Sequence, residues 1–304
     1  MVTYDPSILY LNCNASSSFS EEEENQITES ISKNGICIIR NFQSAESVST
    51  LKKEAELVCK FGYGIGIGNN LPYVSGQLFS EFRFPYLVSE AAMQYLMDHR
   101  LMSTLRNSLG DDFFIHHSLF QISHPRKEQI LDFHIDCGSQ KALNKKTKFD
   151  DYRIRSILYL TDVTSGGFSY IMNTHEKALK TFMNLPDGEL FPEDQVPLDD
   201  PNRIINVNEK AGTLVLFNTH GLHRGEIPKE TRIVLNTWFA QRDFKATVNP
   251  TPFNYSFIKP HQKEHLHVFN SPSHYPTEDF INQNLIPQSS KNKIKSMIRK
   301  TIGI

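Results

Sequence analysis

Residues 212–239 read GTLVLFNTHGLHRGEIPKETRIVLNTWF. Two short segments of this stretch are rich in β-branched and aromatic residues, and turn-forming residues separate them, which predicts two strands. Similar segments recur earlier in the chain: FFIHHSLFQIS (113–123), LDFHID (131–136), YRIRSILYL (152–160) and GGFSYIM (166–172). Several short strands with turns between them predict an all-β sandwich or barrel.

Helical signals dominate the chain before this β-rich region. Ser18 or Ser20 could cap a helix that has acidic residues in its first turn and ends at Gly35. The pattern also predicts a buried strand at 35–42 and helices at 44–62 and 89–110. We therefore expect one domain, 1–304, made of an N-terminal helical part (18–110), a β core (111–245) and a C-terminal extension (246–304).

Two segments fit neither regular pattern. Residues 62–86 begin with alternating glycines (GYGIGIG) but lack the GxGxxG spacing of a phosphate loop, which leaves a loop over a site or an irregular strand. Residues 176–209 are acidic and contain prolines, as is typical of a surface insertion. Both flank predicted strands, so we expect them to form a lid. The candidates for substrate contact, with core packing as the alternative, are Tyr63, Tyr73, Phe79 and Phe82.

The composition excludes several classes of protein. With 32 basic and 34 acidic residues among 304, the formal net charge is −2, so the chain lacks the basic surplus of a dedicated nucleic-acid binder. We find no signal-peptide pattern and no apolar stretch of the length that a transmembrane helix needs. The four cysteines form no CxxC pair and are too few for a disulfide scaffold, so we expect a cytoplasmic protein.

The C-terminal segment 289–304 is basic, and its apolar residues follow helical spacing. A helix of this kind could contact a membrane surface. A solvated terminal helix or a frayed tail is the alternative interpretation.

Two histidines and a carboxylate stand out as candidate metal ligands. His134 and Asp136 are two residues apart, so on a strand both side chains point to the same face. Either His220 or His223 could complete a two-His-one-carboxylate set, which leaves three positions of a non-haem Fe(II) open. Arg232 suits the far end of a dicarboxylate co-substrate, because a guanidinium pairs with a carboxylate through two parallel hydrogen bonds.

These residues give the chain a resemblance to the phytanoyl-CoA dioxygenase family of Fe(II)- and 2-oxoglutarate-dependent oxygenases. The family pattern is H-x-D, then a distal His followed by x-Gly, then an Arg. It maps here to His134, Asp136, His223 with Gly225, and Arg232. The stretches 31–56 and 156–177 also resemble family segments, so the resemblance covers roughly residues 28–240.

The resemblance implies a mainly β fold with flanking α-helices. This fold is a double-stranded β-helix, or jelly-roll, with the N-terminal helices packed on one sheet. The resemblance also implies that His134, Asp136 and His223 are the catalytic residues that hold Fe(II). His220 is then expected to lie behind the ligands or to be exposed.

The co-substrate site follows from the same resemblance. 2-Oxoglutarate is expected to chelate the metal through its keto-acid end and to pair with Arg232 at its other end, with Gln121 as a further polar contact. Arg155 lies on the predicted strand at 152–160. Its side chain could contact the co-substrate or the substrate, and an exposed ion pair is the alternative.

The function expected from these residues is a dioxygenase that uses O2 and 2-oxoglutarate to hydroxylate a small organic substrate, with release of succinate and CO2. Asp136 favours hydroxylation, because halogenating relatives lack the carboxylate. Two alternatives remain. A cupin-type metal enzyme that does not use 2-oxoglutarate is disfavoured by Arg232, and a non-catalytic jelly-roll binding protein is disfavoured by the intact ligand set.

Overall fold

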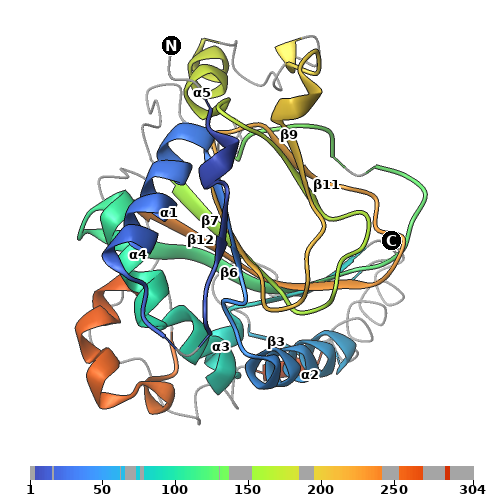
Figure 1. The fold of residues 1–304 in the computed structure, drawn as a ribbon. Coiled ribbons are helices and arrows are strands. Elements are labelled where there is room, and N and C mark those ends of the chain that lie inside the picture. Colours follow the sequence, from blue (N-terminus) through green and yellow to red (C-terminus); the bar gives the residue numbers. More distant parts are fainter. Residues whose placement is uncertain are drawn as a thin grey trace.

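The computed structural model describes residues 4–15, 17–61, 63–65, 73–75, 79–129, 131–136, 153–184, 195–241, 253–269 and 285–287. Two β-sheets face each other at the centre of this part of the chain (Figure 1). The larger sheet has the spatial order β1 (Tyr10–Asn12), β2 (Ile36–Arg40), β10 (Leu214–Asn218), β7 (Arg153–Tyr159), β12 (Arg232–Gln241), β6 (Phe113–Ser123), β5 (Phe79–Arg83) and β4 (Tyr73–Ser75). The smaller sheet has the order β11 (His223–Gly225), β8 (Phe168–Ile171) and β9 (Ile204–Val207). These are the two layers that a jelly-roll requires.

The strands of the larger sheet separate two hydrophobic cores. In β2, Cys37 and Ile39 pack in an outer core, whereas Ile36 and Ile38 pack in an inner core between the two sheets. Successive side chains of a strand point to opposite faces, so a strand that is buried on both faces is apolar throughout. This explains why β2 appears in the sequence as a continuous apolar run.

Helices cover the outer face of the larger sheet. They are α1 (Glu21–Asn34), α2 (Ala45–Phe61), α3 (Glu90–Leu96) and α4 (His99–Leu109), and Figure 1 shows them on one side of the molecule. Ile27 of α1, Leu51 of α2 and Leu105 of α4 belong to the outer core together with strand residues. The predicted packing of the N-terminal helices on one sheet is confirmed.

Local signals in the sequence set the ends of α1. The Ser20 hydroxyl accepts a hydrogen bond from the Glu23 N–H (3.2 Å), and the Glu23 carboxylate accepts one from the Ser20 N–H (2.7 Å). This reciprocal pair selects Ser20 over Ser18 as the cap. Gly35 ends the helix with φ +80°, and a Cβ there would lie 2.2 Å from the Tyr170 hydroxyl oxygen, so only glycine fits.

The helix predicted at 89–110 is two helices, α3 and α4. The Ser89 hydroxyl caps α3 by accepting from the Ala92 N–H (2.8 Å). The Asp98 carboxylate caps α4 by accepting from the Arg100 N–H (3.0 Å). A second capping residue inside one apolar pattern restarts the helix, because its side chain takes up a backbone donor that the preceding turn would otherwise bind.

Two further predictions of local structure were wrong. Residues 131–136 do not form a strand, and only His134 makes a β-bridge, with His223. The segment 176–209 is not a single irregular insertion. It begins within α5 (His175–Met183) and ends with β9, which pairs with β8.

The segment 62–86 is also more regular where it is described. It contains β3 (Tyr63–Ile65), β4, β5 and the short helix η2 (Pro85–Leu87), and β3 pairs with β13 (Leu285–Pro287). The rest of this segment, Cys137 and the basic tail at 289–304 lie outside the described residues.

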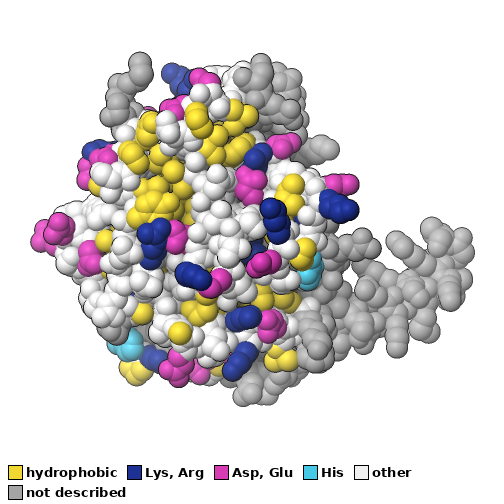
Figure 2. All heavy atoms as spheres, turned by 45° about the vertical axis from the view of Figure 1, so that its right-hand side comes forward, with side chains coloured by type: hydrophobic (Ala, Val, Ile, Leu, Met, Phe, Trp, Pro, Cys, Tyr) yellow, Lys and Arg dark blue, Asp and Glu magenta, His cyan; other side chains and the backbone are white. Residues whose placement is uncertain are grey.

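The surface drawn in Figure 2 carries acidic and basic side chains interspersed with one another, and hydrophobic side chains gather in its upper part. No described helix has the length and apolar character needed to cross a membrane. Among the described residues, Cys13 and Cys37 are not in disulfide bonds.

Candidate active site

Backbone hydrogen bonds bring the three predicted ligands together. The N–H of His134 donates to the carbonyl of His223 (3.0 Å), and the N–H of His223 donates to the carbonyl of His134 (2.9 Å). Two residues on, the N–H of Asp136 donates to the carbonyl of Thr219 (2.9 Å). The stretch that carries His134 and Asp136 is thereby fixed along the edge of the smaller sheet, beside β11.

Further hydrogen bonds orient the two imidazole rings. Nδ1 of His134 lies 2.8 Å from the Asp132 carbonyl oxygen, and Nδ1 of His223 lies 2.8 Å from the Gly221 carbonyl oxygen. A carbonyl oxygen only accepts, so each Nδ1 carries the proton and each Nε2 presents a lone pair. Backbone carbonyls that bind the second ring nitrogen are the usual outer partners of metal-binding histidines.

The three ligand atoms surround one point. Nε2 of His134 lies 3.7 Å from Oδ1 of Asp136, and Nε2 of His223 lies 3.6 Å from Oδ2. One ligand atom from each of the three residues lies within 4.8 Å of the others. Two imidazole nitrogens and one carboxylate are the donor set that binds non-haem Fe(II) with positions left open.

The protonation state of these groups fits a metal ion. His223 is buried, and its Nε2 has no hydrogen-bond partner among the described residues. A buried lone pair without a donor is unfavourable unless a cation binds it. Burial, together with the neighbouring His223, lowers the pKa of His134 to about 4, which keeps the ring neutral as a ligand must be.

Asp136 is held ionised by its neighbours. Burial alone would raise the pKa of its carboxyl group, but that pKa lies well below its ordinary value. The charge of Arg155 and the hydrogen bond from Trp238 favour the ionised form whatever the protonation state of His223. Nη1 of Arg155 lies 3.3 Å from Oδ2, and Nε1 of Trp238 lies 3.0 Å from the same oxygen. The sequence left the role of Arg155 open, and the structure places its guanidinium on the candidate ligand.

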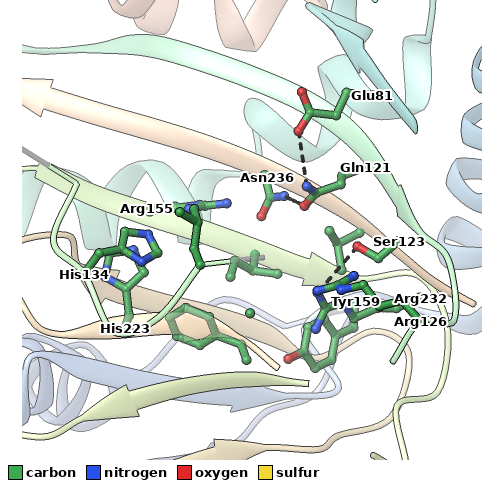
Figure 3. A pocket seen from close by; sticks show the side chains of 15 residues that line it. Glu81, Gln121, Ser123, Arg126, His134, Arg155, Tyr159, His223, Arg232 and Asn236 are labelled. Carbon is green, nitrogen blue, oxygen red and sulfur yellow. Dashed lines mark hydrogen bonds between the residues drawn. The ribbon is translucent and has the colours of Figure 1, made fainter. Parts of the chain in front are cut away.

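A cavity of about 280 Å³ lies between the two sheets next to the ligands (Figure 3). His134 and His223 are at one end of it, and Arg232 and Arg126 are at the other end. The polar residues among those that line it are Glu81, Gln121, Ser123, Arg126, His134, Arg155, Tyr159, His223, Arg232 and Asn236. The cavity therefore joins a candidate metal site to a cationic end.

The guanidinium of Arg232 is held in one orientation and has no acidic partner among the described residues. Its Nη1 donates to the carbonyls of Gly166 (2.7 Å) and Gly167 (2.5 Å), and its Nη2 lies 3.5 Å from the Ser123 hydroxyl. Burial lowers the pKa of Arg126, and the nearby positive charge of Arg232 lowers it further. Among the described residues, no carboxylate lies within ion-pair distance of either arginine. Two guanidinium groups without a counter-ion suit the carboxylate of a ligand.

Gln121 lies on the cavity wall. Its Oε1 accepts from Asn236 (2.9 Å), and its Nε2 donates to Glu81 (3.2 Å), as the dashed lines in Figure 3 show. These bonds run across β12, β6 and β5 and fix which way the amide faces. Burial raises the pKa of Glu81.

The other candidates lie elsewhere. Phe82 is fully buried in the outer core, on the face of β5 opposite to Glu81, so its expected substrate contact was wrong and core packing is correct. The side chains of Tyr63, Tyr73 and Phe79 lie outside the described part of the structure. His220 is buried, its N–H donates to the Asn218 side chain (3.0 Å), and its ring is not among the three clustered ligands.

The sequence interpretation missed Glu81, Ser123, Arg126 and Asn236 as cavity residues. Strand periodicity could have found two of them. Ser123 is two residues from Gln121, and Asn236 is four from Arg232, so each shares a face with a predicted site residue. Glu81 and Arg126 could not be found in this way, because their placement depends on which strands pair.

Comparison with known families decides the relationship. A family model described as Phytanoyl-CoA dioxygenase (PhyH) matches residues 31–227, which is more than half of the chain. The protein belongs to this family. The matched residues include all three candidate ligands, and no curated protein matches the chain. The predicted enzyme class, a non-haem oxygenase that uses Fe(II) and 2-oxoglutarate, is confirmed by this membership.

Solved structures with the same fold are distant in sequence. EctD from S. alaskensis, with 2-oxoglutarate and 5-hydroxyectoine, is 17% identical with a TM-score of 0.57 and covers 79% of this chain and 82% of its own. HygX from Streptomyces hygroscopicus, with nickel, 2-oxoglutarate and hygromycin B, is 13% identical with a TM-score of 0.52, covering 74% and 89%. The carbocyclase SnoK from nogalamycin biosynthesis is 16% identical with a TM-score of 0.52, covering 76% and 87%. These similarities confirm the double-stranded β-helix.

Proposed function

We propose that the protein hydroxylates a small organic substrate, consuming O2 and 2-oxoglutarate and releasing succinate and CO2. One observation carries the proposal. A single cavity of about 280 Å³ has His134 and His223 at one end and Arg232 at the other. A dicarboxylate that binds a metal through one end needs this arrangement, since its second carboxylate must find a cation at a fixed separation.

We assign His134, Asp136 and His223 as the residues that hold Fe(II). When bound there, iron supplies the oxidising chemistry, and the protein supplies geometry and the exclusion of water. The two Nδ1–H groups remain bonded to backbone carbonyls, which keeps both Nε2 lone pairs directed at the metal. His220 takes no part in metal binding in this assignment.

We assign Arg232 to the distal carboxylate of 2-oxoglutarate. Its Nη1 is committed to the Gly166 and Gly167 carbonyls, and these bonds hold the guanidinium plane still. Its Nε has no partner among the described residues and is available to the ligand, with the Ser123 hydroxyl beside Nη2. Gln121 would contact the same co-substrate through an amide that Asn236 and Glu81 hold in one orientation.

A small organic substrate is supported by the molecules bound in the solved relatives. The structure of EctD contains 5-hydroxyectoine and that of HygX contains hygromycin B, and both are small molecules. Hydroxylation is supported in this chain by Asp136, whose carboxylate completes the ligand set. We further propose a cytoplasmic location, which is supported by Cys13 and Cys37, neither of which is in a disulfide bond.

Anaerobic titration of the Fe(II)-loaded protein with 2-oxoglutarate tests the proposal. We expect a weak visible charge-transfer band that saturates at one equivalent, because the keto acid chelates the metal. A library of small substrates is then screened for succinate release above the uncoupled rate, with mass spectrometry of the product for one added oxygen. Iron binding without the band would favour the cupin-type alternative. Absence of iron binding would favour a non-catalytic binding protein.

A further inference from the structure

The only tryptophan of the chain lies beside the candidate metal site. Trp238 is on β12, and its indole N–H donates to Oδ2 of Asp136 at 3.0 Å. Arg155, on β7, donates to the same oxygen from Nη1 at 3.3 Å. The carboxylate of Asp136 therefore accepts two hydrogen bonds from strands of the larger sheet. The backbone of Asp136, in contrast, is hydrogen-bonded to Thr219, close to β11 of the smaller sheet.

The indole is fixed from two sides by its cross-strand partners. Trp238 is directly opposite Arg155 on β7 and opposite His117 on β6. The Arg155 guanidinium carbon lies 3.9 Å from the centre of the indole ring, and the His117 ring centre lies 5.3 Å from it. A bulge in the β12–β6 register follows directly after Trp238. Bulges of this kind re-aim side chains next to functional sites.

The two donors use the binding capacity of one carboxylate oxygen. Each oxygen of an ionised carboxylate has two lone-pair directions, so Oδ2 is filled by Trp238 and Arg155 while Oδ1 keeps both of its own. Oδ1 lies 3.7 Å from Nε2 of His134 and Oδ2 lies 3.6 Å from Nε2 of His223, so the two donors on Oδ2, and not these distances, distinguish the two oxygens. A carboxylate that bound a metal through both oxygens would occupy one more position, and three positions must stay open for a chelating co-substrate and O2.

We propose that Trp238 and Arg155 are positioning residues that restrict Asp136 to binding the metal through Oδ1 alone. The reason for keeping metal positions open rests on the proposed function. The hydrogen bonds of Trp238 and Arg155 to Asp136 do not depend on that function. Trp238 is only partly buried and belongs to none of the hydrophobic clusters formed by the described residues, so packing in the core does not explain it. Asp136 is the one carboxylate within ion-pair distance of Arg155 in the described part of the chain.

The first test reads the hydrogen bond without any metal. Protein labelled with 15N-tryptophan has one indole N–H signal, because the chain has one tryptophan. We expect that signal to be shifted downfield, to exchange slowly with water, and to move on Asp136→Ala. A signal at the position of a free indole that does not respond to Asp136→Ala would overturn the proposal.

The second test removes the donor and keeps the shape. Biosynthetic replacement of tryptophan by benzothienylalanine puts sulfur in place of the indole N–H and changes position 238 alone. We expect Co(II) affinity to fall roughly 10- to 100-fold, the range typical of lost outer-sphere partners, with thermal unfolding of the metal-free protein unchanged. Arg155→Met should act in the same direction, and Arg155→Lys should restore part of the affinity. Affinities within twofold of the unmodified protein would overturn the proposal.

A third measurement separates this inference from the proposed function. At saturating Co(II), the substituted protein should bind 2-oxoglutarate more weakly, because a released Oδ2 competes for the third position. If unmodified protein binds Co(II) but not 2-oxoglutarate, the proposed function fails while the two tests above still decide the positioning role. If 2-oxoglutarate binds both proteins equally at saturating metal, the restriction to Oδ1 is wrong.

Discussion

Gly221 packs directly against Tyr170, so closely that a Cβ at Gly221 would lie 1.8 Å from the Tyr170 hydroxyl oxygen. The Tyr170 hydroxyl itself donates to the Asn218 carbonyl (3.1 Å), so it cannot simply turn away. The carbonyl of Gly221 accepts the Nδ1 proton of His223. The turn that carries a candidate metal ligand is thus held in place by an aromatic residue of β8.

Gly221→Ala is therefore expected to damage both folding and metal binding. The added methyl group must displace Tyr170 or the turn, which we expect to lower the free energy of unfolding by about 2–3 kcal/mol. Thermal unfolding and Co(II) affinity measure the two effects. Gly110→Ala is the matched control, because a Cβ there meets nothing within 4 Å and only the left-handed φ is strained. If Gly221→Ala behaves as Gly110→Ala does, the contact with Tyr170 does not position His223.

The ligand assignment predicts a sharp contrast between two histidines that are three residues apart. His134→Ala, Asp136→Ala and His223→Ala should each abolish turnover and reduce metal affinity by at least roughly 100-fold. His220→Ala should keep the metal, because the ring of His220 is not part of the cluster. Isothermal titration with Co(II) provides the measurement. Loss of metal in His220→Ala with retention in His223→Ala would reverse the assignment.

Arg232 should control the affinity for 2-oxoglutarate and leave metal binding nearly intact. Charged hydrogen bonds contribute about 1.5–3 kcal/mol, so Arg232→Ala should weaken 2-oxoglutarate roughly 10- to 150-fold at saturating metal. Arg232→Lys should lie between Ala and the wild type, because a lysine keeps the charge but loses the planar fork. The charge-transfer band gives the affinity. Equal affinity in the wild type and in Arg232→Ala would remove Arg232 from the co-substrate site.

Arg126 offers a separate test of the cationic end of the cavity. Arg126→Gln removes the second guanidinium and should weaken 2-oxoglutarate by roughly fivefold, because the group is partly exposed and screened by solvent. The loss should shrink as salt is added. Lys127→Gln is the matched control, since Lys127 is adjacent, exposed and absent from the cavity wall. If both variants lose the same affinity, the effect comes from net charge and not from the site.

Local physical signals were enough to predict many elements of the fold. Gly35 predicted the end of α1, because glycine readily adopts the left-handed conformation of a helix cap. The two-residue spacing of His134 and Asp136 predicted that both side chains reach one site. The two-residue spacing identified His134 and Asp136 correctly, but the strand on which that argument relied does not form. The two residues are brought together by bonds to His223 and Thr219, and not by membership of a strand.

Strand order was beyond local reasoning. β12 lies between β7 and β6 in the larger sheet, and this order brings Glu81, Gln121 and Asn236 into one row. Side-chain period tells which residues of one strand share a face, but the neighbours across the sheet are set by packing of the whole chain. The division of 89–110 at Asp98 was missed for a different reason, since an apolar pattern can continue through a cap.

The attachments of the stretch 131–136 have a consequence for how long the protein survives in a cell. This stretch joins no strand beyond one bridge. Phe133 and Ile135 pack in a small hydrophobic cluster, and the backbone-to-backbone hydrogen bonds of the stretch to other described residues are those of His134 and Asp136. A metal ion held by His134, Asp136 and His223 would link this stretch to β11. At a free metal concentration 100 times the dissociation constant, binding adds about 2.7 kcal/mol to the free energy of unfolding. Iron starvation would then lower the amount of this enzyme through faster proteolysis, in addition to slowing the molecules that remain.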